Sequence, residues 1–343
     1  MRKKLLFPRI GPTGPLDELC GGIGYMELAQ GDVFHRANAA IEARKVLGED
    51  YFGGWEPADA EMFSRYRTPS VATPGKITDF LGIKASASFH PWAQHYDNVV
   101  IAQIPLPDDS LRAEAIEYYA TLHSLESAAP DTFKVAELGA SYGPWTCACA
   151  VLAARTGRTN TRFVAIEASS YLYDLIPQHL AENEIDPGTS HITLVKGAVA
   201  AERGILYFPR VESPMDNGGQ AKADDAGVDY LGRTVAHDRV EAYPLEDILG
   251  GDIWDLVHMD VQGVEYEVLS AGIEILNRNV RGIFIGTHSR KIEGQLLELF
   301  HGQGWTLERE RPTKFEYRPG TPDIVGWTTR DGGQYWRNPK IVS

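Results

Sequence analysis

Three side chains near the ends of two apolar runs can move a proton or hold a metal ion. His258 and Asp260 close the run 254–260, and His288 follows the run 280–285. Side chains alternate along a strand, so His258 and Asp260 share a face, and an adjacent parallel strand brings His288 near them. His288 could act as a general base, since an ordinary histidine pKa of about 6.5 suits that task. Alternatively, Asp260 and His288 could bind a divalent cation beside His258, or the histidine could be structural.

Two carboxylates occupy the ends of two earlier strands. Glu137 precedes the turn from Gly139 to Gly143, and Glu167 ends the run 162–166. Acidic groups at successive strand ends suit a cationic ligand that carries a ribose. A dinucleotide site would need Gly-x-Gly-x-x-Gly in the first turn to receive a pyrophosphate, and this turn lacks it. S-adenosylmethionine, which has no phosphate, therefore fits better than NAD.

The turn, helix and strand next to these carboxylates are expected to supply the other residues of the cofactor site. The glycines let the backbone approach a ligand, and the helix predicted at 145–155 aims its unpaired N–H groups at the same place. Glu167 would accept hydrogen bonds from the ribose hydroxyls, and the small residues after the strand 192–196 would border the adenine. The predicted cofactor-binding residues are Glu137, Gly139, Ala140, Ser141, Tyr142, Gly143, Glu167, Ala168, Gly197, Ala198, Val199, Asp260 and Val261.

Apolar strands and amphipathic helices alternate from residue 133 onward, which predicts a doubly wound α/β fold. The second half supplies helices at 263–277 and 293–302. Its strands are expected at 239–243, 254–260, 280–285, 305–310 and 324–329. Together with the first three strands, these predict a mainly parallel sheet of about seven strands, with ligands at the carboxyl ends.

Residues 1–106 differ in composition from the rest and predict a substrate-selecting cap on a catalytic domain at 107–343. The cap contains a predicted helix at 36–47 and aromatic segments at 51–55 and 89–96, which could stack on a sugar or pack in a core. A long glycine-rich, acidic segment at about 209–232 is interpreted either as a flap over the ligand or as a surface insertion.

The chain has 343 residues, 43% of them apolar, and a formal net charge of −14. This charge opposes binding to nucleic acid or to anionic lipid, because both require a positive surface. Three cysteines are too few for a disulfide framework, and no apolar run reaches a membrane-spanning length. These features favour a cytoplasmic protein with an uncharged or cationic partner, and base rates favour a homodimer.

With these residues in view, the stretch 133–310 resembles the FkbM family of S-adenosylmethionine-dependent methyltransferases. The resemblance rests on the order and spacing of the blocks 137–143, 166–168, 197–199, 243–247 and 254–265. The family usually has Asp-x-Glu-Gly-x-Glu where this chain reads Asp260-Val261-Gln262-Gly263-Val264-Glu265. Gln262 removes a charge there, so no role of that carboxylate is carried over.

The resemblance implies a class I methyltransferase with a Rossmann-like core. It also implies O-methylation of a small-molecule or saccharide acceptor, such as a carbohydrate or a natural-product metabolite. Mg²⁺ is a possible second cofactor only through the divalent-cation site considered above for Asp260 and His288. Two other functions stay open. One is a catalytically silent domain that binds glycan or a partner protein, and the other is a nicotinamide oxidoreductase that binds a pyrophosphate at 139–143.

Overall fold

A computed structural model describes residues 53–104, 114–214, 218–225, 227–229 and 232–341. The helix predicted at 36–47 lies outside these residues, as do Tyr51, Phe52 and six residues of the segment 209–232. Within the described part of the chain, no helix is long and apolar enough to cross a membrane.

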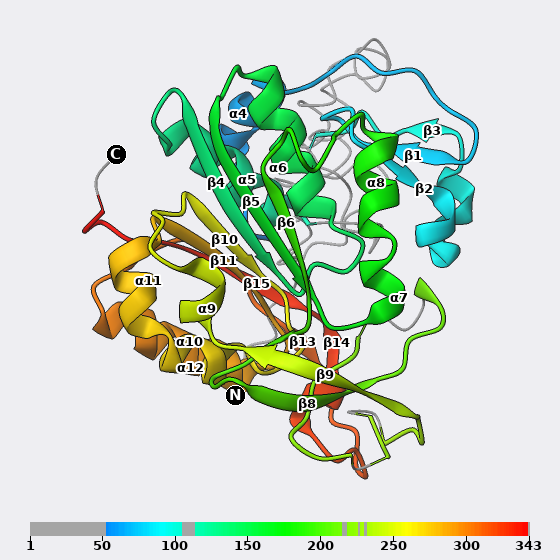
Figure 1. Cartoon of the computed structure of the whole chain (residues 1–343), viewed down its shortest axis with the longest axis vertical. Helices are drawn as coiled ribbons and strands as arrows, with labels where there is room; N and C mark the ends of the chain where they lie inside the picture. The colour runs from blue at the N-terminus through cyan, green and yellow to red at the C-terminus, as the bar shows by residue number, and fades with distance from the viewer. Residues whose placement is uncertain (1–52, 105–113, 215–217, 226, 230–231, 342–343) are drawn as a thin grey trace, which may run out of the picture.

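One seven-stranded sheet forms the centre of the molecule (Figure 1). Its strands, in spatial order, are β12 (Thr306–Arg311), β15 (Gly332–Arg337), β11 (Gly282–Thr287), β10 (Leu256–Met259), β4 (Thr132–Leu138), β5 (Asn160–Glu167) and β6 (Ile192–Lys196). The pairs from β11 to β6 are all parallel, whereas β15 runs antiparallel to both β11 and β12. The predicted number of strands is therefore confirmed, and the sheet is mixed.

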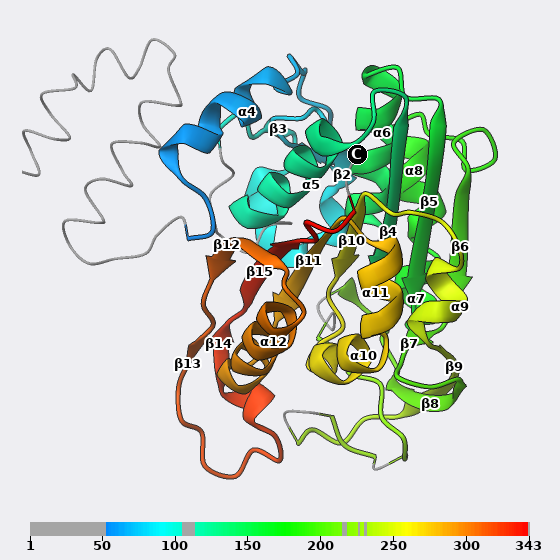
Figure 2. The same ribbon diagram turned by 90° about the vertical axis from the view of Figure 1, so that its left-hand side faces the viewer.

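Helices cover both faces of this sheet, as Figures 1 and 2 show. Neighbouring residues of one strand point into different cores: Val135 packs with α5 and α6, whereas Ala136 packs with the helices opposite. The first face carries α5 (Ala115–Ser127), α6 (Pro144–Arg155) and α8 (Ile176–Glu182); the second carries α9 (Leu245–Leu249), α10 (Glu265–Ala271), α11 (Ile273–Asn279) and α12 (Arg290–Gly302). All six residues of β11 are buried, as expected for a strand covered on both sides. The doubly wound prediction is confirmed.

Two predicted strands of the main sheet are wrong. The strand expected at 239–243 is β9 (His237–Tyr243), which belongs to a separate sheet with β7 (Ala198–Val199) and β8 (Gly204–Pro209). Only Ala242 of β9 is buried, so this strand lacks the apolar faces of a central parallel strand. The stretch expected at 324–329 forms the 3₁₀ helix η5 (Ile324–Trp327) and the start of β14 (Thr328–Arg330), which pairs with β13 (Lys314–Phe315).

Two predicted helices are interrupted. The helix expected at 263–277 divides at Gly272 into α10 and α11, where an added Cβ would lie 2.5 Å from Leu245. The sequence also predicts a helix at about 171–183, after the strand that ends at Glu167, and this helix divides into α7 (Ser170–Tyr173) and α8. By contrast, α12 begins before its predicted start, because the Ser289 side chain accepts a hydrogen bond from the Ile292 amide.

The described part of the N-terminal region shares a hydrophobic core with α5 and α6. It contains η1 (Pro57–Asp59), α4 (Ala60–Arg65), η2 (Ala87–Phe89), η3 (Pro91–Tyr96) and the sheet β2 (Lys84–Ser86)–β1 (Lys76–Thr78)–β3 (Val99–Val100). Phe80 lies 6.1 Å from the Phe63 ring and 4.9 Å from the Tyr118 ring of α5. Trp55 packs on Phe63 at 5.7 Å, so this aromatic residue belongs to the core.

Candidate active site

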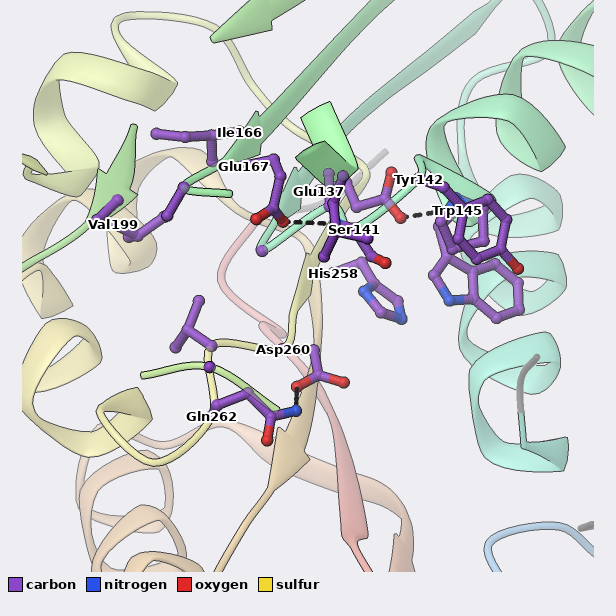
Figure 3. A pocket seen from close by; sticks show the side chains of 18 of the residues that line it. Glu137, Ser141, Tyr142, Trp145, Ile166, Glu167, Val199, His258, Asp260 and Gln262 are labelled. Atoms are coloured by element: carbon purple, nitrogen blue, oxygen red, sulfur yellow. Dashed lines mark hydrogen bonds between the residues drawn. The ribbon is translucent and has the colours of Figure 1, made fainter. Parts of the chain in front are cut away.

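A pocket lies at the carboxyl ends of β4, β5 and β10 (Figure 3). It has an empty volume of about 1090 Å³, which includes its open mouth. The predicted residues that line it are Glu137, Gly139, Ala140, Ser141, Tyr142, Glu167, Ala168, Gly197, Ala198, Val199, His258, Asp260 and Val261. Gly143 and His288 do not line it. Gly143 instead ends the turn before α6 at a φ of 76°, where an added Cβ would meet Ile176 at 2.9 Å.

The first turn of the pocket touches the end of β10 directly. Gly139 has a φ of +78°, and a Cβ added there would lie 1.9 Å from the carbonyl oxygen of Asp260. Only glycine combines this backbone conformation with so close an approach. Two strand ends that carry predicted site residues are therefore held against each other.

Glu137 caps helix α6. Its carboxylate accepts hydrogen bonds from the backbone N–H groups of Trp145 at 2.9 Å and Thr146 at 2.8 Å. Pro144, the first residue of the helix, has no N–H group. The prediction that the first N–H groups of this helix face a ligand is therefore wrong, because Glu137 already occupies them. Burial raises the pKa of Glu137 despite these hydrogen bonds.

Glu167 is held rigidly at the centre of the pocket. One carboxylate oxygen accepts the Ser141 N–H at 2.7 Å and the other accepts the Ser169 N–H at 2.7 Å. Burial raises the pKa of Glu167 to about 7, although these backbone donors favour the charged form. Each oxygen keeps a second lone pair, so the carboxylate can also accept two hydroxyl groups.

His288 lies between two carboxylates. Its Nδ1 is 2.7 Å from Oε1 of Glu265 and its Nε2 is 3.2 Å from Oδ1 of Asp260. Burial opposes the charge on the ring, but the negative charges of Glu265 and Asp260 outweigh it and raise the pKa of His288 well above its usual value. A ring protonated on both nitrogens has no lone pair to accept a proton. This environment does not support the predicted role of His288 as general base.

Asp260 and His288, the predicted metal ligands, pair with each other. Gln262 also donates to Oδ1 of Asp260 at 3.1 Å. Burial opposes the charge of Asp260, yet His288 keeps the pKa of this carboxyl below its usual value. Among the described residues, no group of three or more His, Cys, Asp or Glu side chains is arranged to hold a metal ion. The predicted metal site is not formed in this structure.

A buried Glu–His pair lines the pocket beside Asp260. Oε1 of Glu117, on α5, lies 3.0 Å from Nε2 of His258 and accepts the indole N–H of Trp145 at 3.0 Å. The His258 ring lies between Trp145, at 5.2 Å, and Phe284, at 4.7 Å. Its Nδ1 is buried and has no hydrogen-bond partner in the described part of the chain. Burial raises the pKa of Glu117.

Sequence reasoning missed Glu117 because no local motif marks it, and only the packing of α5 on the sheet brings it to His258. Two other lining residues, His90 and Trp92, come from the N-terminal aromatic segment that was predicted either to stack on a sugar or to pack. His90 Nε2 lies 3.1 Å from the Tyr142 hydroxyl. Gly219 and Ala221, within the predicted flap, also reach the pocket.

The sheet order and this pocket define a class I methyltransferase. Counted along the chain from β4, the strands lie in the order 3-2-1-4-5-7-6, with the seventh antiparallel. The Methyltransferase FkbM domain model matches residues 137–313, about half of the chain. The protein therefore belongs to the FkbM methyltransferase family, which confirms the resemblance, and this membership implies the use of S-adenosylmethionine.

A curated relative from Jannaschia sp. (strain CCS1), named "Putative methyltransferase", is 27% identical over 275 residues, which span 79% of this chain and 95% of the relative. Among solved structures, Methyltransferase FkbM from Methylobacillus flagellatus KT is 15% identical, with a TM-score of 0.37 and coverage of 64% of this chain and 54% of that one. Precorrin-6y C5,15-methyltransferase from Geobacter metallireducens GS-15 is 12% identical, with a TM-score of 0.36 and coverage of 69% and 92%.

Proposed function

We propose that this protein transfers a methyl group from S-adenosylmethionine to a hydroxyl group of a carbohydrate or another natural-product metabolite. The observation that carries the proposal is that one pocket contains both a carboxylate suited to a ribose, Glu167, and a histidine with an unpartnered ring nitrogen, His258.

The residues that line the pocket suit S-adenosylmethionine. Glu167 would accept the two ribose hydroxyls with its remaining lone pairs. The small side chains of Ala198 and Val199 would border the adenine, while Gly139 and Ser141 would shape the methionine end. The methyl group would then face the side of the pocket that carries His258 and Asp260. The cofactor supplies an electrophilic methyl group, and the chain supplies its placement.

The Glu117–His258 pair has the geometry of an oriented general base. An alcohol is a weak nucleophile at neutral pH, so a base must take its proton as the oxygen attacks, and this typically contributes about 10²–10⁴-fold. Glu117 would accept the N–H at Nε2 of His258, which leaves the lone pair at Nδ1. As the acceptor oxygen attacked the methyl group, His258 would take the hydroxyl proton at Nδ1, and the sulfur of S-adenosylmethionine would leave with the electron pair of the carbon–sulfur bond.

Surface chemistry supports a neutral or cationic acceptor. Trp92 is 37% exposed and lines the pocket, so it offers an aromatic face on which a sugar ring can stack. The net charge of −14 disfavours phosphorylated acceptors and nucleic acids. The N-terminal region that carries Trp92 would then help to select the acceptor, as expected for a cap.

A labelled-methyl assay with a panel of monosaccharides and glycosylated metabolites tests this proposal. His258→Gln and Glu117→Gln should lower kcat by about 10²–10⁴-fold and leave the Kd for S-adenosylmethionine unchanged. His301→Gln, at an exposed histidine of α12, is the matched control. Wild-type kcat in both variants would exclude this base. Cofactor and glycan binding without transfer to any acceptor would favour the silent glycan-binding alternative.

A further inference from the structure

Asp260 presents to the cofactor pocket one carboxylate oxygen that accepts no hydrogen bond from a described residue. Both nearby donors contact Oδ1 instead: Nε2 of His288 at 3.2 Å and the side-chain N–H of Gln262 at 3.1 Å. The Asp260 side chain lines the pocket and is 39% exposed, and Figure 3 shows its second oxygen turned away from Gln262. One oxygen therefore fixes the side chain, and the other can contact a ligand.

The other three carboxylates that line the pocket accept hydrogen bonds on both oxygens. Glu137 and Glu167 each accept two backbone N–H groups. Glu117 accepts the indole N–H described above on Oε1 and the Glu114 N–H on Oε2, at 2.6 Å. No Lys or Arg side chain from the described residues lines the pocket. A cation bound there would therefore find its acceptor at Asp260.

The charge of His288 does not cancel the charge of Asp260, because Glu265 pairs with the same ring at 2.7 Å. With the ring protonated on both nitrogens, these three side chains together carry one negative charge. Gln262 adds no charge, although the family usually has glutamate at this position. A glutamate would also lack the N–H group that holds Oδ1 of Asp260. The amide is therefore a feature of this chain that orients the carboxylate.

The methionine end of the cofactor would lie beside this carboxylate. The turn at Gly139 touches the end of β10, since a Cβ added to the glycine would lie 1.9 Å from the Asp260 carbonyl oxygen. S-adenosylmethionine on this turn, with its ribose on Glu167, would bring its α-ammonium and its sulfonium to that strand end. Methyl transfer removes the sulfonium charge, whereas the product S-adenosylhomocysteine keeps the α-ammonium.

We propose that Asp260, held by Gln262 and His288, pairs with the sulfonium and makes the protein bind S-adenosylmethionine more tightly than S-adenosylhomocysteine. The neutral sulfur of the product loses this attraction, so the product leaves readily and inhibits weakly. The inference rests on the cofactor orientation proposed above, and it does not depend on the identity of the methyl acceptor.

Calorimetric titration of the full-length protein with S-adenosylmethionine, S-adenosylhomocysteine and sinefungin tests the proposal. Sinefungin carries an ammonium group where S-adenosylmethionine carries its S–CH₃ group, so it reports the effect of a cation without the sulfur. Both cationic ligands should bind at least tenfold more tightly than S-adenosylhomocysteine, because an ion pair in a partly buried pocket is only weakly screened by solvent.

Three variants separate the charge of Asp260 from other effects. Asp260→Asn should raise the Kd of both cationic ligands at least tenfold and leave that of S-adenosylhomocysteine nearly unchanged, which also shows that the pocket is intact. Gln262→Leu removes the N–H donor without a change in charge and should reduce the preference for the cationic ligands several-fold. Asp174→Asn removes a negative charge at a side chain that is 71% exposed, and it should leave the preference unchanged.

Equal affinities of the wild-type protein for S-adenosylmethionine and S-adenosylhomocysteine would overturn this inference and leave the cofactor site in place. Equal losses of both ligands in Asp260→Asn would overturn it too, since they would assign the carboxylate to the α-ammonium that both ligands carry. Gln262→Leu keeps the test available if Asp260→Asn does not fold, and an unchanged preference in that variant would also contradict the inference. Binding of none of the three ligands would overturn the proposed cofactor site itself.

Discussion

Glu167 connects the stability of the empty protein to its affinity for the cofactor. Its pKa of about 7 in the folded protein lies above the ordinary value of 4.5. A raised carboxyl pKa means that the stabilisation from this group is complete below pH 4.5 and is lost as the pH rises through about 7. Hydroxyl donors from a ribose favour the ionised form. Cofactor binding should therefore lower the pKa of Glu167 and release a proton near neutral pH.

The affinity for S-adenosylmethionine should rise about tenfold between pH 6 and pH 8, because the ionised fraction of Glu167 rises by about that factor. Glu167→Gln should bind the cofactor more weakly and with no such pH dependence. Calorimetric titration at several pH values measures both effects, with Glu298→Gln as an exposed control. A flat profile for the wild-type protein would exclude Glu167 as the titrating ribose ligand.

His288 should stabilise the protein through its charge. Because its pKa is raised well above 6.5, its contribution is complete below that pH and is lost in the alkaline range, as the ring deprotonates. His288→Asn leaves the carboxylate of Glu265, which is 0% exposed, without its cation. We expect this variant to lose about 3–5 kcal/mol at neutral pH and to show a flatter alkaline dependence.

Urea unfolding at pH 7 and pH 9 measures the effect of His288. Glu265→Gln keeps an oxygen for the Gly263 N–H, which Glu265 now accepts at 2.8 Å, but removes the buried charge. The double variant His288→Asn/Glu265→Gln should therefore lose less than the two single losses added together. Strict additivity would show that the two side chains do not act as a charge pair.

At the scale of elements, the contact between the β4 turn and the end of β10 should be sensitive to a single methyl group. Gly139→Ala places its Cβ 1.9 Å from the Asp260 carbonyl oxygen, which forces the two strand ends apart. Gly157 has a similar φ of +71°, but nothing lies within 4 Å of its added Cβ. Gly157→Ala therefore measures the backbone cost alone, about 1–2 kcal/mol.

Gly139→Ala should lose several kcal/mol more than Gly157→Ala in urea unfolding, because it adds an overpacking clash to the same backbone strain. It should also lose measurable binding of S-adenosylmethionine in calorimetry, which Gly157→Ala should keep. Similar losses in the two variants would mean that the turn can move away from Asp260 at little cost.

Local sequence predicted the strands that are themselves apolar runs in the sequence. β4, β5 and β6 are apolar runs, and their predicted positions agree with the structure within two residues. β15 begins with Gly332-Gly333-Gln334, which has no strand pattern, and it is a strand because β11 and β12 lie on either side of it. The strand predicted at 239–243, β9, is wrongly placed in the main sheet for the same reason: pairing between distant segments leaves no local signal.

The candidate active site shows the same difference between features with a local sequence signal and features that depend on distant contacts. Glu167 and the turn at Gly139 were predictable because ligands lie at the carboxyl ends of parallel strands. The partners of the two histidines were not predictable, because they are carboxylates distant in the sequence. Glu265, at the start of α10, contacts His288, and Glu117, on α5, contacts His258. A sequence pattern can place a histidine on a strand, but it does not show which charged side chains from other elements will contact its ring.

At the scale of the whole molecule, the described N-terminal residues 53–104 and the methyltransferase sheet should unfold together. Phe80 is 1% exposed and belongs to the same hydrophobic core as Tyr118 of α5 and Phe133 of β4. A continuous core that contains both regions has no boundary at which one could lose structure alone. This expectation differs from that for a hinged cap, which would have its own core and a polar interface.

Phe80→Ala tests this coupling because it removes a ring that contacts both regions. The cavity should cost about 3–5 kcal/mol, and far-UV circular dichroism and tryptophan fluorescence should show one coincident transition at a lower urea concentration. Val71→Ala, at a side chain that is 83% exposed, should leave the midpoint unchanged. If Phe80→Ala instead produced a first transition with cofactor affinity retained beyond it, the N-terminal region would be a separate folding unit. Its residues His90 and Trp92 would then reach the pocket only while that unit is docked.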